Sequence, residues 1–192
     1  MPEKKAQSGM TLVEILVAMV MMGIIITGVY NLFRAHNLMA AKQEETTMMQ
    51  QELLSAMVQM ADDLRMCGYS NSTASTTGFN ATSNATVVIC TKDFDLSSNS
   101  TLLGFRLNTV NNTLDYINAT GGWEPAAINI SNLTLTYFDI DGNNIANITG
   151  ATAGLIRSIG VTATAIAAPA RAGLNIGNRT MNTRVYCRNT GL

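Results

Sequence analysis

The sequence has few of the residues that catalysis and metal binding require. Its 192 residues include one histidine, His36, and three cysteines, and no CxxC or CxxH spacing occurs. Ser-His-Asp and Cys-His arrangements therefore have no histidine base outside the N-terminal region, and a four-cysteine zinc site cannot form. No glycine-rich phosphate loop is present. The sequence predicts a protein that is not an enzyme and that has no cofactor.

Charge is also scarce. Charged residues make up 13% of the chain, and 12 basic against 13 acidic residues give a net charge of -1. Such a chain cannot neutralise a row of phosphates, which argues against nucleic acid as a partner. Asn, Thr, Ser, Ala and Gly are abundant instead, and Ile, Leu, Val and Tyr recur between them. This composition is typical of a β-rich domain outside the cytoplasm rather than of a disordered chain.

One long apolar segment lies near the N-terminus. No residue from Ile15 to Phe33 is charged, and as a helix this segment would span roughly 28 Å, close to the hydrocarbon thickness of about 30 Å. Lys4 and Lys5 precede it and favour a cytoplasmic N-terminus. Because no A-x-A-like cleavage site follows the segment, we expect it to stay as a membrane anchor rather than to be removed as a signal peptide.

The start of this segment resembles the N-terminal signature of type IV pilins and pseudopilins. The run Gly9-Met10-Thr11-Leu12-Val13-Glu14 follows a short basic leader and leads into the apolar residues. The resemblance implies that a prepilin peptidase cleaves after Gly9 and methylates the new N-terminus at Met10. It also implies that Glu14, the fifth mature residue, pairs with the amino terminus of a neighbouring subunit during assembly.

Some positions depart from the commonest pattern of this family. Met10 replaces the usual Phe, and Asn31 stands where many major pilins have a proline. Gly23 and Gly28 are then the places where the helix could loosen, because glycine costs a helix about 1 kcal/mol relative to alanine. A simpler interpretation of Glu14 stays open, in which the carboxylate only complements the helix dipole or pairs with its own amino terminus.

The helix is expected to continue past the membrane segment. Residues 34–67 contain neither proline nor glycine and are rich in good helix formers, and Gly68 is the expected stop. Apolar residues at steps of four and three form one stripe, called here the apolar stripe: Met49, Leu53, Met57, Met60, Leu64 and Cys67. We expect it to pack on a sheet; a promiscuous methionine-rich surface and a dimeric coiled coil are the alternatives.

After Gly68 the sequence is typical of strands joined by polar turns. About five strands are expected, in a meandering antiparallel sheet of which one face covers the apolar stripe. The segments concerned are 87–90, 101–108, 113–118, 132–138, 155–167 and 182–189. The predicted fold class is therefore α+β and pilin-like, with a long N-terminal helix on an antiparallel sheet. The predicted parts are a leader (1–9), a membrane or filament-core helix (10–34), an amphipathic helix (35–67) and a β domain (68–192).

Three cysteines allow one disulfide and one thiol, and a location outside the cytoplasm favours oxidation of one pair. A Cys67–Cys90 bond would tie the helix end to the next strand, and a Cys90–Cys187 bond is the alternative. The sequence alone does not decide between these two pairings.

Asp139, Asp141 and Asn143 are spaced like the first ligands of a calcium loop. The twelfth position of such a loop needs an acid and is Gly150 here. A hairpin turn is therefore the favoured interpretation, with calcium as the alternative.

Several C-terminal blocks, among them MADDLRMCGYS, IRSIGVTATA and NTRVYCRNTGL, resemble PilW-like minor pilins. The resemblance implies an inner-membrane protein with a periplasmic β domain that later joins the pilus at the cell surface. Its implied partners are prepilin peptidase and other minor and major pilins, in a complex that initiates assembly or forms the pilus tip. A J-like pseudopilin of type II secretion is one alternative. A membrane-tethered binding module that never polymerises is an alternative from another class.

Overall fold

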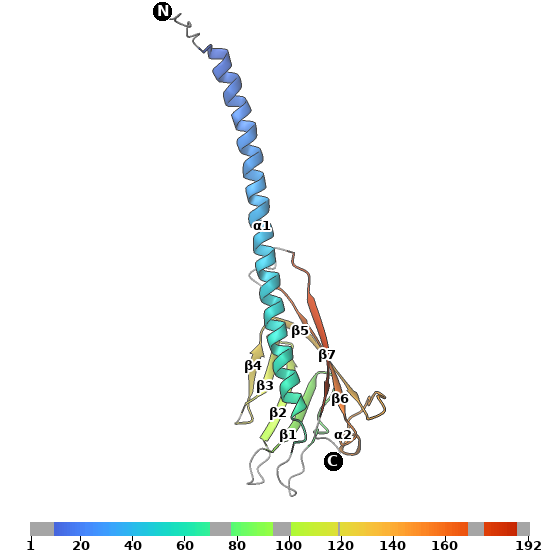
Figure 1. Cartoon of the computed structure of the whole chain (residues 1–192). Coiled ribbons are helices and arrows are strands. Elements are labelled where there is room, and N and C mark those ends of the chain that lie inside the picture. The colour runs from blue at the N-terminus through green and yellow to red at the C-terminus, as the bar shows by residue number, and fades with distance from the viewer. Residues whose placement is uncertain (1–9, 70–77, 94–100, 119, 169–174, 188–192) are drawn as a thin grey trace, which may run out of the picture. The chain divides into compact units, whose positions relative to one another are not determined.

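A computed structural model describes residues 10–69, 78–93, 101–118, 120–168 and 175–187 (Figure 1). The predicted fold class is confirmed, since a long N-terminal helix precedes antiparallel β-sheets. The chain divides into two compact units, residues 1–44 and 45–192.

One helix, α1, runs from Leu12 to Arg65. Gly23 and Gly28 lie in α-helical geometry, and the Thr27 hydroxyl donates a hydrogen bond to the Gly23 carbonyl at 2.8 Å. The helix is therefore not unwound at either glycine. Gly68, with φ of 79°, follows the helix end and has the left-handed backbone that commonly terminates a helix.

The first unit exposes an apolar surface along α1. Every residue from Met10 to Ala40 is exposed. A core helix of a soluble domain would bury such side chains against other elements. This part of α1 is long and apolar enough to cross a membrane and lies near the N-terminus. We therefore describe it as a membrane anchor.

The second unit contains two antiparallel sheets. The first has the order β1-β2-β3-β4 and consists of β1 (Val87–Lys92), β2 (Thr101–Asn108), β3 (Thr113–Ile117) and β4 (Trp123–Ala127). The second has the order β5-β6-β7 and consists of β5 (Ile130–Phe138), β6 (Ser158–Ala165) and β7 (Arg179–Tyr186). A short helix, α2 (Gly150–Ala153), lies between β5 and β6 in the chain.

The structure differs from the sequence prediction in the number of sheets. Strands follow one another as a meander within each sheet, but β4 does not pair with β5. Asn129, between these strands, has φ of 58°, a left-handed conformation that redirects the chain. The sequence analysis also missed β4, whose middle residue, Pro125, is of a type that is rare inside strands. Proline is tolerated there because β4 is an edge strand.

The apolar stripe forms the helical side of the core in the second unit, as predicted. Leu53, Met60 and Leu64 have no exposed surface. They belong to one cluster with inward-facing residues of both sheets, which include Val88, Phe105, Leu114, Leu133, Val161 and Val185. Burying a side chain of this size contributes about 1.5–3 kcal/mol. The stripe therefore holds the second half of α1 to both sheets.

Tyr137 of β5 contacts the first sheet through its hydroxyl group. The residue is 3% exposed, and the hydroxyl oxygen lies 2.9 Å from the Asn84 carbonyl and 3.2 Å from the Val87 carbonyl. Burial raises the pKa of Tyr137 well above its ordinary value, so the hydroxyl stays protonated and donates at neutral pH.

We expect Tyr137→Phe to lower the free energy of unfolding by about 1–2 kcal/mol, because the buried tyrosine loses the hydrogen bond from its hydroxyl group to the first sheet. Tyr186→Phe is the matched control, since Tyr186 is 64% exposed and its change should stay within about 0.5 kcal/mol. Denaturant titration of the full chain in detergent, followed by circular dichroism, measures both. Equal midpoints for the two variants would contradict a stabilising role for this hydroxyl.

Candidate functional site

Thr11 and Glu14 build the N-terminus of α1. Thr11 directly precedes the first helical residue, Leu12. The Glu14 amide donates to Thr11 Oγ1 at 3.3 Å, and the Thr11 amide donates to Glu14 Oε2 at 3.4 Å. This reciprocal arrangement is a capping box. It gives each of two N–H groups at the helix start a side-chain acceptor, and the Glu14 amide also donates to the Thr11 carbonyl at 3.1 Å.

The carboxylate of Glu14 therefore has a role within its own chain. It lies in the first turn of α1, where the helix dipole favours a negative charge. A carboxylate in hydrocarbon costs a few kcal/mol, less near the membrane surface, and the capping hydrogen bond offsets part of that cost. Glu14 is exposed, so its carboxylate is also open to a positive group from outside the chain.

The sequence analysis missed Thr11. A threonine followed three residues later by a glutamate, just before an apolar run, is the sequence pattern of a capping box. That pattern could have identified Thr11 as the residue that orients Glu14.

We expect Thr11→Ala to weaken the first turn of α1 by about 1 kcal/mol, because the capping hydroxyl is lost. In detergent-solubilised protein, amide hydrogen exchange at Glu14 and Ile15 should become about fivefold faster. Thr11→Ser keeps a hydroxyl and should exchange like the wild type. Unchanged exchange in Thr11→Ala would show that the cap does not stabilise this turn.

In the sequence, the predicted processing residues directly precede Thr11. Met10 is the first described residue and is 73% exposed. Gly9, Lys4 and Lys5 lie outside the described residues, so cleavage after Gly9 and the leader charges stay predictions. In the sequence, the Gly9–Met10 bond directly precedes the capping Thr11.

The N-terminal region that contains Gly9, Met10 and Glu14 matches a known family model. Residues 4–30 match a family model described as the prokaryotic N-terminal methylation motif. The chain carries a prepilin signature of the type IV pilin and pseudopilin kind. The matched residues of this pilin-like chain include Gly9, Met10 and Glu14 and most of the apolar segment. A search of the curated proteins finds no significant match.

The motif and the structure together define the coarse class of this protein. The motif supports a type IV pilin-like or pseudopilin protein, and the apolar N-terminal helix supports membrane anchoring. The motif implies processing by prepilin peptidase and assembly with other pilins. It suggests a structural rather than an enzymatic role.

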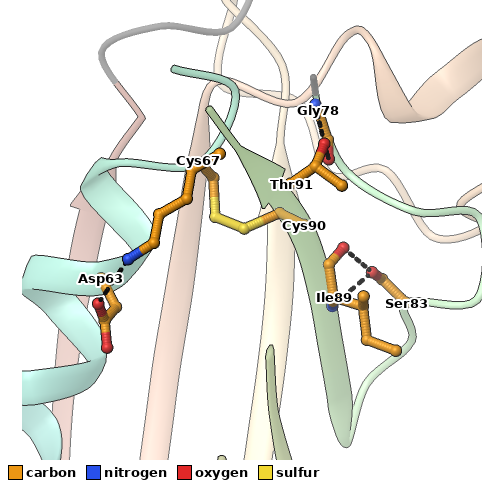
Figure 2. The surroundings of a disulfide bond; sticks show 8 residues. Asp63, Cys67, Gly78, Ser83, Ile89, Cys90 and Thr91 are labelled. Atoms are coloured by element: carbon orange, nitrogen blue, oxygen red, sulfur yellow. Dashed lines mark hydrogen bonds and ion pairs between the residues drawn. A yellow bond between two sulfur atoms is a disulfide. The ribbon is translucent and has the colours of Figure 1, made fainter. Parts of the chain in front are cut away.

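In this pilin-like chain a disulfide joins the end of α1 to β1. Cys67 and Cys90 form the bond, with Cα atoms 5.6 Å apart (Figure 2). Lys92 Nζ lies 3.6 Å from the Asp63 carboxylate beside it. The Gly68 amide also donates to a carbonyl of β1, at 3.0 Å. A covalent bond, an ion pair and a backbone hydrogen bond thus fix the helix end on the strand.

Cys187 is not part of the disulfide and lies buried at the end of β7. Burial raises the pKa of this thiol to about 12, although the Arg157 guanidinium opposes the shift. The thiolate is therefore scarce at neutral pH, and the group behaves as a small apolar side chain.

The calcium candidates form a tight turn after β5. Asp139 accepts hydrogen bonds from the Asp141 amide at 3.0 Å and from the Asn143 amide and side chain at 2.8 and 3.1 Å. The hydrogen bond from the Asn143 side chain is the main cause that lowers the pKa of Asp139. Asp139 is thus engaged within the turn. No group of three or more His, Cys, Asp or Glu that could hold a metal occurs in the described part of the chain.

Proposed function

We propose that this protein is a PilW-like minor pilin of a type IV pilus and that it acts in the complex that initiates assembly or forms the pilus tip. One observation supports this most strongly. The prepilin motif at residues 4–30 includes the start of a single helix of 54 residues. Residues in the second part of that helix belong to the hydrophobic core of a β-rich unit. Resemblance of the C-terminal blocks to PilW-like minor pilins supports the narrower assignment.

The proposed topology is a single pass through the inner membrane. Lys4 and Lys5 favour a cytoplasmic leader, which supports a periplasmic location of the second unit. The Cys67–Cys90 disulfide supports this orientation, because structural disulfides persist in oxidising compartments. After assembly the second unit lies at the pilus surface.

The proposed mechanism is an exchange of partners at the helix N-terminus. Cleavage after Gly9 creates an α-ammonium group on Met10. In the membrane, the Glu14 carboxylate is held by the capping box of its own chain. As the apolar helices leave the lipid and pack together, Glu14 pairs with the ammonium of a neighbouring subunit, which neutralises both charges and sets their axial register.

Deletion and complementation test the proposal. A strain that lacks this chain should produce few surface pili, and wild-type expression should restore them. Mass spectrometry of sheared filaments should find the protein as a small minority of the subunits. Normal piliation with reduced export of hydrolases would instead support a J-like pseudopilin of type II secretion. A chain that never enters filaments and begins at Met1 would support a tethered binding module.

A further inference from the structure

The two sheets of the second unit have four edge strands, β1, β4, β5 and β7. The edge at β1 is covered by another segment of the chain. The segment that contains Gly78 and Asn80 runs along β1. The Asn80 amide donates to the Ile89 carbonyl at 2.8 Å, and the Thr91 amide donates to the Gly78 carbonyl at 3.0 Å. This edge therefore has no room for a further strand.

Two more edges are closed in other ways. Along β5, the Leu135 amide donates to the Ala85 carbonyl at 2.7 Å, and the Tyr137 carbonyl accepts from the Ile145 amide at 2.8 Å. On β4 the middle residue is Pro125, which has no N–H. Proline on an edge strand prevents pairing with another chain.

The fourth edge, β7, is open within the described part of the chain. All eight residues of β7 pair with β6. On its other side, no backbone hydrogen bond joins β7 to another described segment. The strand contains neither proline nor lysine. Of the four edges, β7 is thus the one that neither a described segment nor a proline protects, although it carries the charged residues Arg179 and Arg184.

The direction of the backbone groups in β7 follows from its register. The Cys187 amide donates to the Arg157 carbonyl, toward β6. In an antiparallel ladder, residues alternate between those that bond to the partner and those that point away. Thr180, Asn182 and Arg184 therefore point their N–H and C=O groups away from β6, toward the open side.

A groove lies beside this edge, between β7 and α1. It has a volume of about 480 Å³. Its apolar lining comprises Leu54, Met57, Val58, Ala61 and Met181, and its polar lining comprises Asn182, Thr183 and the ion pair of Asp62 with Arg65. Leu54 and Val58 are 54% and 51% exposed, although both are large apolar side chains on the helix. A strand added to β7 would direct every second side chain toward this apolar floor. Backbone pairing and side-chain burial are thus available at one place.

We propose that β7 is the docking edge for an extended strand of a different pilin-type subunit, an inference that rests on the proposed function. The docking strand has apolar residues at alternate positions, which enter the groove, and at least one acidic residue. Charge complementarity selects this occupant, because β7 contains Arg179 and Arg184 and no acid. A second copy of β7 would bring arginines to the same arginines and is disfavoured. The recognition mode is addition of a strand to a sheet edge.

Photo-crosslinking of the full-length chain in cells tests this inference. Benzoylphenylalanine replaces Val58 in the groove. We expect an adduct with a protein that itself has a prepilin signature, through an alternating apolar peptide. Adding Asn182→Pro, which removes an outward N–H and no bond to β6, should reduce the adduct at least tenfold, whereas Asn182→Ala should retain it. No adduct, equal adduct in both variants, or an adduct within the same chain or with a second copy would overturn the inference.

A second pair of variants covers the case in which the proline prevents folding. Val58→Lys places a charge in the groove and leaves β7 intact, and Gln51→Lys adds the same charge to an exposed position outside the groove lining. Crosslinking from benzoylphenylalanine at Thr183 should fall at least tenfold in Val58→Lys and not in Gln51→Lys. Equal crosslinking in both would contradict the proposal.

The same samples separate this inference from the proposed function. If the mature chain begins at Met10 and enters filaments while Asn182→Pro and Val58→Lys have no effect, only the docking edge is wrong. If the chain begins at Met1 and stays out of filaments, the proposed function fails.

Discussion

We expect Glu14→Ala to abolish entry of this protein into filaments, while the proposed cleavage after Gly9 proceeds normally. The reason is that the ammonium group of a neighbouring Met10 would be buried without its counter-charge. Removing one partner of a buried ion pair costs about 3–5 kcal/mol, which corresponds to a factor of roughly 100 or more in the assembly equilibrium. Immunoblots of the sheared filament fraction measure the incorporated protein, and mass spectrometry of the membrane fraction measures cleavage.

Two further variants separate the charge of Glu14 from its capping role. Glu14→Gln removes the charge but keeps a side chain that serves in a capping box. Thr11→Ala removes the capping hydroxyl and keeps the charge. We expect Glu14→Gln to fail in assembly nearly as completely as Glu14→Ala, and Thr11→Ala to assemble. Normal assembly of Glu14→Gln would show that the carboxylate matters as a helix cap alone.

The Cys67→Ser, Cys90→Ser double variant should lose about 3 kcal/mol of unfolding free energy. The disulfide closes a loop with a sequence separation of 23, and loops of this length contribute about that amount by restricting the unfolded chain. Denaturant titration of the full chain in detergent, with and without reductant, measures the loss. The wild type under reducing conditions should unfold at the same denaturant concentration as the double variant.

Cys187 provides the matched control for the disulfide. Cys187→Ala removes a buried thiol without breaking a bond and should cost about 1 kcal/mol. Alkylation of the unreduced wild type should be slow while the protein is folded, because burial raises the pKa of Cys187 to about 12. One equivalent should react after denaturation. A titration in which Cys187→Ala is as unstable as the double variant would contradict the assignment of the stabilising bond to Cys67 and Cys90.

The long helix could be predicted from the sequence because its determinants are local. Steps of three and four between apolar residues such as Leu53, Met57 and Met60 define the buried face, and these residues are buried in the structure. Gly68, the expected stop, lies three residues after the last helical residue, Arg65. The strands with clear alternation, such as β5, were predicted for the same reason.

Three features were not predicted from the sequence: the division into two sheets, the helix α2 and the open edge of β7. The sheets and the edge depend on pairing between distant residues, and α2 is very short. The chain passes from the first sheet to the second at Asn129, whose left-handed backbone the residue type permits but does not require. The helix α2 has four residues, with Thr149 and Thr152 in a capping box, and is too short for a periodic pattern. The strand β7 lies at a sheet edge because it pairs only with β6. Pairing between strands cannot be predicted from a local sequence pattern.

Part of the candidate site could also be predicted from the sequence, and part was found only in the structure. Gly9, Met10 and Glu14 lie within six consecutive residues, so a local signature identifies them, and residues 4–30 match the methylation motif. The hydrogen bonds between Thr11 and Glu14 were found only in the structure. They show that the Glu14 carboxylate, which we propose to pair with a neighbouring subunit, accepts a hydrogen bond within its own chain.

Mass spectrometry of the purified protein's N-terminus tests the account most directly. The proposed pairing with Glu14 of an adjacent subunit requires a free amino group at the start of the mature chain. We predict a chain that starts at Met10 with a methylated amino group. A chain that starts at Met1, with the leader still attached and no new ammonium group at the helix cap, would contradict it.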